Sequence, residues 1–253
     1  MFVDTHCHLF KEYFEDLDKV IKSSQFNLVN YYINNGSDAD SNKEVLELIK
    51  KYHNMYGALG IHPEDVDKYK TEDLKFIEQN INNSKIVAIG EIGLDYYYTK
   101  ENKERQIDLL EQQLKIAEKY HMPVIIHSRE ATQDTIDTLK KYQVKGVIHS
   151  FSGSLEVAKI YVKMGYLLGV NGVITFKNAH IKDVIREVGL ENIVLETDSP
   201  YLTPEPYRGR QNTPEHIFDI AKFVATLFQV SLEELADITN NNIKKLYTKM
   251  IID

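Results

Sequence analysis

Eight short apolar segments, each the length of a β-strand, recur along the chain, and most are followed by an amphipathic segment. In residues 103–120, for example, Ile107, Leu110 and Leu114 keep the 3.6-residue period of a helix. Regular alternation of this kind is typical of parallel strands joined by crossover helices. The predicted strands are Phe2–His6, Asn27–Asn34, Met55–Ile61, Lys85–Glu91, Pro123–His127, Lys145–His149, Tyr166–Val170 and Asn192–Glu196.

Eight such units in 253 residues match the size of a closed (β/α)8 barrel. An open, doubly wound sheet is the structural alternative, and it predicts a glycine-rich loop after the first strand. Residues 7–11, Cys-His-Leu-Phe-Lys, contain no glycine. We therefore predict an α/β fold with one TIM-barrel domain over residues 1–253. Extra C-terminal helices are expected to begin at Thr213 and Ser231, which stand at helix-start patterns.

Ligand-type side chains stand at the carboxyl ends of six predicted strands. In a (β/α)8 barrel these ends form one rim, and active sites lie there. His6 and His8 are two residues apart, which is about 7 Å along a strand and on one face. A single histidine of this kind is more often structural than a ligand, but the shared position of the whole set makes coincidence a poor explanation. The rim set is His6, His8, His62, Glu91, His127, His149 and Asp198.

Imidazole and carboxylate donors without a thiolate favour Mg²⁺, Mn²⁺ or Zn²⁺ over a structural tetrathiolate zinc. The set has too many donors for one ion with an open position, so we predict two divalent ions about 3.5–4 Å apart. Glu91 is the expected bridge because it is the only rim acid midway round the barrel. One ion would be held by His6, His8, Glu91 and Asp198, and the other by Glu91, His127 and His149.

Glu91 and Asp198 are the predicted catalytic residues. The metals would lower the pKa of a shared water toward about 7, and Asp198 would accept its proton. The alternative for Asp198 is a cap at the start of a helix or turn. Glu196, expected on the same strand face, would accept a hydrogen bond from a ligand histidine.

Arg129, Arg208 and Arg210 are the cations of the predicted rim, and a guanidinium suits bidentate contact with phosphate. A surface salt bridge in a chain rich in acids explains each arginine equally well. The tyrosine run at 96–98 could stack on nucleobases, although such a run in a loop packs against the protein as often.

Charge and cysteine content limit the classes of function. The chain has 30 basic and 38 acidic residues, a net charge of −8, which argues against broad adhesion to nucleic acid through a basic face. A nuclease is not excluded, because metal ions supply positive charge locally. Cys7 is the only cysteine, and we expect it to pack as a small apolar group in a cytoplasmic protein. No apolar run reaches the roughly 18 residues of a membrane span, so no membrane contact is expected.

The motifs at the strand ends resemble those of the TatD family of metal-dependent deoxyribonucleases. They occur in the family's order and cover essentially the whole chain. The matching segments are Asp4-Thr5-His6-Cys7-His8, Gly60-Ile61-His62-Pro63, Gly90-Glu91-Ile92-Gly93-Leu94-Asp95-Tyr96, His127-Ser128-Arg129, His149-Ser150-Phe151-Ser152-Gly153, Glu196-Thr197-Asp198-Ser199-Pro200-Tyr201-Leu202 and Pro206-Tyr207-Arg208-Gly209-Arg210-Gln211-Asn212-Thr213-Pro214.

The resemblance implies a barrel of the metallo-dependent hydrolase type with the two-metal ligand set given above. It also implies hydrolysis of DNA phosphodiester bonds, with 3′-to-5′ exonuclease activity and roles in DNA repair and in DNA degradation during cell death. In the family His62 and Arg129 lie in the substrate pocket, so His62, Arg129 and Arg208 are the expected substrate-binding residues. The expected partner is DNA, single-stranded or at a 3′ end, and we expect the protein to be a monomer.

Two other classes of function stay open. The same barrel supports metal-dependent hydrolysis of an amide, lactone or nucleobase through changes in its loops, and a panel of substrates would separate these reactions from phosphodiester cleavage. A metal-binding scaffold without turnover would need a broken ligand set, and no expected ligand is missing from the sequence.

Overall fold

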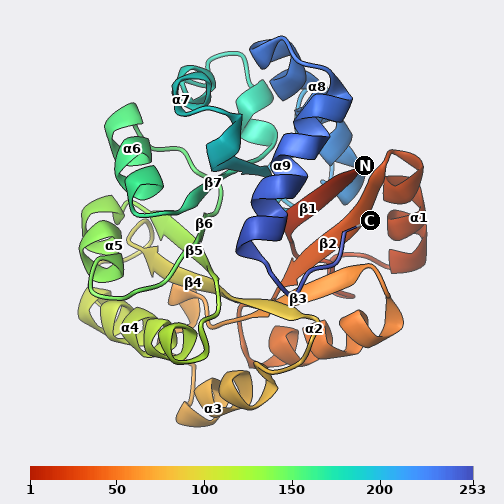
Figure 1. The fold of residues 1–253 in the computed structure, drawn as a ribbon. Helices are drawn as coiled ribbons and strands as arrows, with labels where there is room; N and C mark the ends of the chain where they lie inside the picture. Colours follow the sequence, from red (N-terminus) through yellow and green to blue (C-terminus); the bar gives the residue numbers. More distant parts are fainter. Residues whose placement is uncertain (253) are drawn as a thin grey trace.

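The computed structural model describes residues 1–252, and eight parallel strands form a nearly closed barrel with helices around it (Figure 1). Each strand pairs with the next one in the sequence, from β1 to β8. The predicted (β/α)8 TIM barrel is therefore confirmed. The strands are β1 (Phe2–Cys7), β2 (Val29–Asn35), β3 (Met55–Leu59), β4 (Ile86–Asp95), β5 (Val124–Arg129), β6 (Gly146–Ile148), β7 (Leu167–Val170) and β8 (Ile193–Leu195).

Helices α1 to α7 connect successive strands on the outside of the barrel (Figure 1). Helix α8 packs against β1 and β8, so it is the helix of the eighth unit, and only α9 is additional. The two expected C-terminal helices are therefore present after β8, as α8 and α9. No helix in residues 1–252 is long and apolar enough to cross a membrane. The helices are α1 (Leu17–Phe26), α2 (Ala39–Lys51), α3 (Thr71–Asn80), α4 (Lys103–Tyr120), α5 (Thr132–Leu139), α6 (Leu155–Lys163), α7 (Ile181–Val188), α8 (Ile217–Phe228) and α9 (Leu232–Leu246).

The helix boundaries follow from local sequence. Helix α4 covers the predicted range because its apolar stripe, which includes Leu110 and Leu114, is buried against the barrel. Ser231 starts α9 as expected, because its side chain accepts a hydrogen bond from the Glu234 N–H. Thr213 instead precedes a short 3₁₀ turn, Pro214–His216, that leads into α8.

Strand boundaries differ from the predicted ones where pairing continues or stops. Strand β4 runs four residues past Glu91 to Asp95, because its last residues pair with β5 as far as Arg129. Strands β6 and β8 are only three residues long. Their predicted last residues, His149 and Glu196, lie just beyond them, so these side chains extend from the strand ends.

Side chains of the strands alternate between two apolar clusters. Phe2, Ile86, Val124 and Ile193 belong to the cluster shared with the surrounding helices. Their neighbours one residue on belong to a second cluster inside the barrel, which includes Val3, Val87, Ile125 and Val194 and also Tyr247 and Met250 after α9. Since side chains two residues apart share a face, the next inward positions are His127 on β5 and His149 just after β6.

The barrel closes between β8 and β1 without a regular ladder of backbone hydrogen bonds. The Asp198 N–H donates to the His6 carbonyl at 2.9 Å, and the His8 N–H donates to the Ser199 carbonyl at 2.8 Å. Nearby, the fully buried Asp4 side chain accepts from the Thr197 N–H at 2.9 Å. Side-chain bonds thus replace part of the missing ladder and place the His6–His8 segment beside Asp198.

Candidate metal centre

Glu91 lies at the centre of the predicted rim set and is almost fully buried. Its Oε2 atom is 3.4 Å from His6 Nε2 and 3.5 Å from His8 Nε2. The two imidazole nitrogens are 3.1 Å apart, and Asp198 Oδ1 is 3.6 Å from each of them. Four donor atoms, which we call the first set, therefore surround one small space.

The other oxygen of Glu91 faces a different group of nitrogens, which we call the second set. Oε1 is 2.9 Å from His127 Nδ1 and 3.7 Å from His149 Nε2. His62 Nε2 also approaches it, at 3.6 Å. The structure thus brings together all seven predicted rim residues, with the Glu91 carboxylate between the two sets.

Hydrogen bonds behind three of the histidines decide which ring nitrogen faces the centre. His8 Nδ1 lies 2.9 Å from the Asn35 carbonyl and His149 Nδ1 lies 3.0 Å from Glu196 Oε1. Because these oxygens can only accept, each of these Nδ1 atoms carries a proton and donates it. Nε2 of each ring therefore faces the centre and would present its lone pair to a cation that displaces its proton, as in metal-bound histidines that donate from their other nitrogen.

His127 is held in the opposite orientation. Its Nε2 atom lies 2.8 Å from Asp95 Oδ2, so Nε2–H is the donor to Asp95 and Nδ1 is the nitrogen that faces Glu91. In the metal-free protein Nδ1 also carries a proton and donates it to Glu91, and a cation would replace that proton. Asp95 is not among the predicted site residues. It could have been found by extending the fourth strand, because Asp95 is four residues after Glu91 and hence on the same face of a strand.

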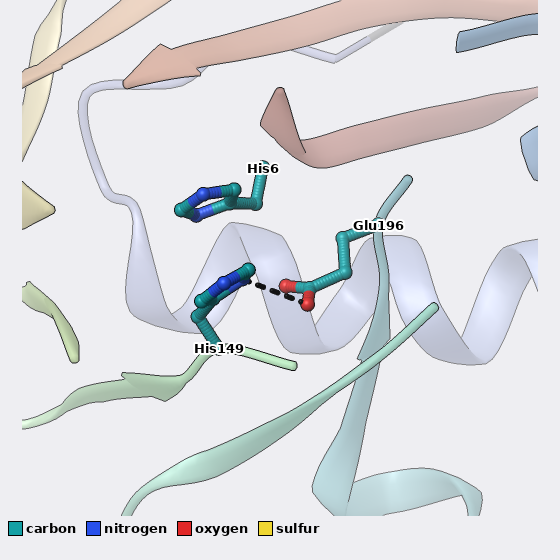
Figure 2. A group of neighbouring side chains, drawn as sticks. All are labelled: His6, His149 and Glu196. Atoms are coloured by element: carbon teal, nitrogen blue, oxygen red, sulfur yellow. Dashed lines mark hydrogen bonds and ion pairs between the residues drawn. The ribbon is translucent and has the colours of Figure 1, made fainter. Parts of the chain in front are cut away.

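His6 and His149 stack on each other deep in the barrel, with the Glu196 carboxylate beside His149 (Figure 2). Their ring centroids are 3.7 Å apart. Glu196 accepts from both His149 Nδ1 and the Ser150 N–H through Oε1. The expected hydrogen bond from a rim histidine to Glu196 is therefore present. Gly169 makes room for it, because a Cβ there would lie only 2.3 Å from the Glu196 carboxylate.

The carboxylates raise the pKa values of three of the imidazoles that face them, whereas burial and the neighbouring His149 lower the pKa of His6. Burial lowers the pKa of His8, but hydrogen bonds and charge from Asp198 and Glu91 outweigh it and raise the pKa to about 10. Burial also lowers the pKa of His149, but the charges of Glu196, Asp198 and Glu91 outweigh it and raise the pKa to about 10. At His127, hydrogen bonds to Asp95 and Glu91 overcome burial and raise the pKa to about 9.

The acids respond in the opposite direction. Burial raises the pKa of Glu91, yet the imidazoles of His149, His6 and His62 hold it well below its usual value. Burial also raises the pKa of Asp198, but His149, His8 and His6 outweigh it and lower the pKa below its usual value. The centre therefore attracts positive charge, which protons or cations can supply.

The first set matches the dimensions of a metal site. Two ligands of a tetrahedral ion with bonds of about 2.1 Å lie about 3.4 Å apart, and the separations of the two imidazole nitrogens from each other and from the two carboxylate oxygens run from 3.1 to 3.6 Å. Nitrogen and carboxylate donors are the ligands that Zn²⁺ and Mn²⁺ accept. Donor chemistry and geometry together indicate that these residues bind a divalent metal.

His62 differs from the other histidines of the centre. Its Nδ1 accepts from the Glu64 N–H at 3.3 Å, which leaves the proton on Nε2. Burial and the neighbouring His127 lower its pKa to about 3, so the ring is neutral. A neutral ring with Nε2–H pointing to the centre can donate a hydrogen bond, in keeping with its predicted contact with substrate.

The arginines lie farther out. Arg129, the last residue of β5, stacks over Tyr97 with its Cζ 3.6 Å from the ring centroid. Arg208 lies over Phe176 and forms an ion pair with Glu205 at 3.7 Å. Among the interactions of residues 1–252, none joins Arg208 to the seven rim residues. Cys7 is buried in the core as expected, with Sγ 3.4 Å from the Ile33 carbonyl.

Sequence comparison reveals relatives over nearly the full length. A family model described as TatD related DNase matches residues 3–248. The chain is 38% identical over 252 residues to YabD, an uncharacterized metal-dependent hydrolase of Bacillus subtilis, covering 98% of this chain and 99% of that protein. It is 34% identical to YcfH, an uncharacterized metal-dependent hydrolase of Escherichia coli, covering 97% and 95%.

Solved structures show the same similarity in three dimensions. YJJV, a TatD homolog from Escherichia coli, superposes with a TM-score of 0.91 at 34% identity and covers 98% of both chains. A TatD-family hydrolase from Entamoeba histolytica gives a TM-score of 0.88 at 26% identity, again over 98% of both chains. The similarity thus includes the strand ends that carry the centre.

Proposed function

The chain belongs to the TatD-related DNase family of metal-dependent hydrolases, and we propose that the bond it cleaves is the phosphodiester bond of DNA. The observation that carries the proposal is that the two oxygens of Glu91 face two separate donor sets. A site for two cations about 3.5–4 Å apart suits in-line displacement at phosphorus. The name of the matching family model and the guanidinium of Arg129 near His127 support the same substrate.

Two divalent ions, Mg²⁺, Mn²⁺ or Zn²⁺, are the proposed cofactors. His6, His8, Glu91 and Asp198 would hold one of them, and Glu91, His127 and His149 the other. When bound, such ions lower the pKa of a water molecule and offset the charge of the phosphate oxygens.

The protein's own residues supply proton transfer and positioning. Asp198 accepts the proton of the attacking water as general base, since its carboxylate is ionised and belongs to the first set. Glu91 keeps the two sets at a fixed separation. His62 donates Nε2–H to a phosphate oxygen, and Arg129 adds a charged contact at the rim. Arg208 is proposed to contact DNA outside the centre.

The finer assignment follows from the family resemblance. We propose 3′-to-5′ exonuclease action by a monomer on single-stranded DNA or DNA ends, in the cytoplasm and in the service of DNA repair. A net charge of −8 is compatible with this substrate when contact is confined to the mouth of the barrel.

The test is cleavage of single-stranded oligonucleotides labelled at either end by purified protein with added Mg²⁺ or Mn²⁺. Shortening from the 3′ end is expected. Glu91→Gln and Asp198→Asn should abolish it, because each removes a charged donor from the first set. Glu72→Gln, an exposed substitution at the start of α3, is the matched control and should leave the rate unchanged.

Two outcomes contradict the proposal. Cleavage that persists in EDTA and in both variants would exclude the centre as its source. Turnover of amides, lactones or nucleobases in a parallel panel, with all phosphodiesters left intact, would assign another reaction to the same metal-dependent hydrolase.

A further inference from the structure

Exposed tyrosines are confined to the mouth of the barrel. The chain has 16 tyrosines, and among residues 1–252 only Tyr97, Tyr98 and Tyr201 are exposed, at 52%, 70% and 49%. They lie on the segments that follow β4 and β8, the strands that lead to Glu91 and Asp198. About half or more of the surface of each of these side chains is therefore open to solvent and available to a ligand.

The Tyr97–Tyr98 pair adjoins the second set. The two rings meet edge to face with centroids 4.9 Å apart, and the Arg129 guanidinium lies over Tyr97. The Tyr97 N–H donates to Asp95 Oδ1 at 2.8 Å, and the other oxygen of Asp95 binds His127. The pair is therefore fixed to the histidine that faces Glu91 Oε1.

The Tyr13–Tyr201 pair adjoins the first set. Its ring centroids are 6.0 Å apart, and the two hydroxyls are 3.2 Å apart. The Tyr201 ring lies 6.4 Å from the ring of His8, which faces Glu91 Oε2. The two tyrosine pairs thus stand beside different oxygens of the same carboxylate, one on each side of the centre.

We propose that the two pairs are nucleobase-stacking subsites that hold the bases flanking the cleaved phosphate of single-stranded DNA. This inference rests on the proposed function and goes further, because it assigns residues that select an unpaired strand. A tyrosine ring can stack on the face of any base, which gives binding that tolerates sequence. In a duplex those faces are covered by neighbouring bases, so a paired strand cannot use both subsites.

The charge of the protein makes stacking the natural source of affinity. Nucleic-acid proteins without a basic face lack the counterion release that supplies most sequence-independent binding. Here a chain of net charge −8 has the Arg129 guanidinium near the centre. If the tyrosine rings supply most of the affinity, the binding constant should depend only weakly on salt. Its logarithm should fall with the logarithm of the salt concentration with a slope of about −0.7 for each phosphate contact.

The experiment measures binding, so that it does not depend on catalysis. Metal-loaded protein is titrated with a short phosphorothioate oligothymidylate, and with an abasic strand of the same length and charge. The chain has no tryptophan, so quenching of tyrosine emission reports stacking directly, and anisotropy of a labelled strand gives the affinity. Tyr97→Ala, Tyr201→Ala and the corresponding phenylalanine variants are compared, with Phe26→Ala as the control, since Phe26 is 88% exposed at the end of α1.

Each alanine variant should bind oligothymidylate about tenfold more weakly or worse, with an unchanged salt slope, while the phenylalanine variants and Phe26→Ala bind normally. The abasic strand should bind weakly to all of them. Equal affinity in the alanine variants, or an equal loss on the abasic strand, overturns the proposal. Binding that depends on the rings but is not followed by cleavage would reject the proposed function and keep the stacking subsites. Cleavage that is unchanged in the alanine variants would keep the proposed function and reject the stacking subsites.

Discussion

At the scale of single residues, Asp95 determines which nitrogen of His127 faces Glu91. Its Oδ2 accepts from His127 Nε2–H, while its Oδ1 accepts from the Tyr97 N–H. A carboxylate can fill both roles because both of its oxygens accept.

Replacing Asp95 by asparagine should therefore weaken metal binding. The new amide oxygen would still accept from the Tyr97 N–H, so the amide NH₂ group would face His127 Nε2. Two donors would then oppose each other, which favours the other tautomer of His127, with its proton on Nδ1. We expect a 10- to 100-fold loss of metal affinity and activity, measured by metal titration of the Asp95→Asn protein. Asp137→Asn on the exposed face of α5 is the control, and equal affinity in the two variants would remove this role from Asp95.

The raised pKa values of three histidines predict how metal binding depends on pH. His8, His127 and His149, with pKa values of about 10, 9 and 10 in the metal-free protein, carry protons at pH 7. A cation must displace those protons, so affinity should fall as the pH falls. Titration of the metal-free protein with Mn²⁺ at pH 7 in two buffers of different ionisation enthalpy should reveal proton release. Metal content unchanged down to about pH 4 would contradict histidine ligation.

At the scale of elements, the junction of β8 and β1 depends on side chains. Thr197 Oγ1 lies 2.5 Å from Asp4 Oδ2 and accepts from the Ser199 N–H at 3.1 Å. Burial raises the pKa of Asp4 to about 8 despite the hydrogen bonds from Thr197. Because His6 and Asp198 lie on the two sides of this junction, it also sets the shape of the first donor set.

Thr197→Val should destabilise the fold by about 1–3 kcal/mol, since it leaves buried polar groups of Asp4 and Ser199 without a partner. Urea unfolding followed by circular dichroism measures the change. Thr248→Val, at an exposed position after α9, should shift the unfolding free energy by less than about 0.5 kcal/mol. If the two variants unfold alike, the junction does not depend on this hydroxyl.

At the scale of the whole molecule, the segment after α9 covers the inner apolar cluster of the barrel. Tyr247 and Met250 pack with Val3, Ile125 and Val194, whose strands carry the rim residues at their other ends. The Tyr247 hydroxyl is buried without a hydrogen-bond partner among residues 1–252. The ring, and not the hydroxyl, is therefore the group that stabilises this contact.

Tyr247→Ala should cost about 3–5 kcal/mol of unfolding free energy, as large aromatic truncations in cores do. Tyr247→Phe should be neutral or slightly stabilising, because it removes a buried hydroxyl that has no partner. Thermal and urea unfolding measure both, with Ile251→Ala as the control at a side chain that is 72% exposed. A Phe variant as unstable as the Ala variant would show that the hydroxyl has a partner.

Periodicity in the sequence was sufficient to predict the barrel and to identify the residues of the rim set. Strand and helix periods fix where a side chain leaves the backbone, and parallel strands bring their carboxyl ends to one edge. Glu91, His127 and His149 could therefore be grouped before any distance was known. The same reasoning extended to Glu196 as the partner of a rim histidine.

Only the tertiary structure decided which atoms meet. Sequence periodicity contains no information on the bond between Asp95 and His127, on the Nε2–H of His62 facing Glu91, or on Arg208 turning to Glu205. These contacts depend on register shifts and on loops from distant parts of the chain, which bring together atoms whose spacing no local period controls. Strand geometry determines the direction of a side chain, whereas its hydrogen-bond partner depends on packing accurate to a few tenths of an ångström.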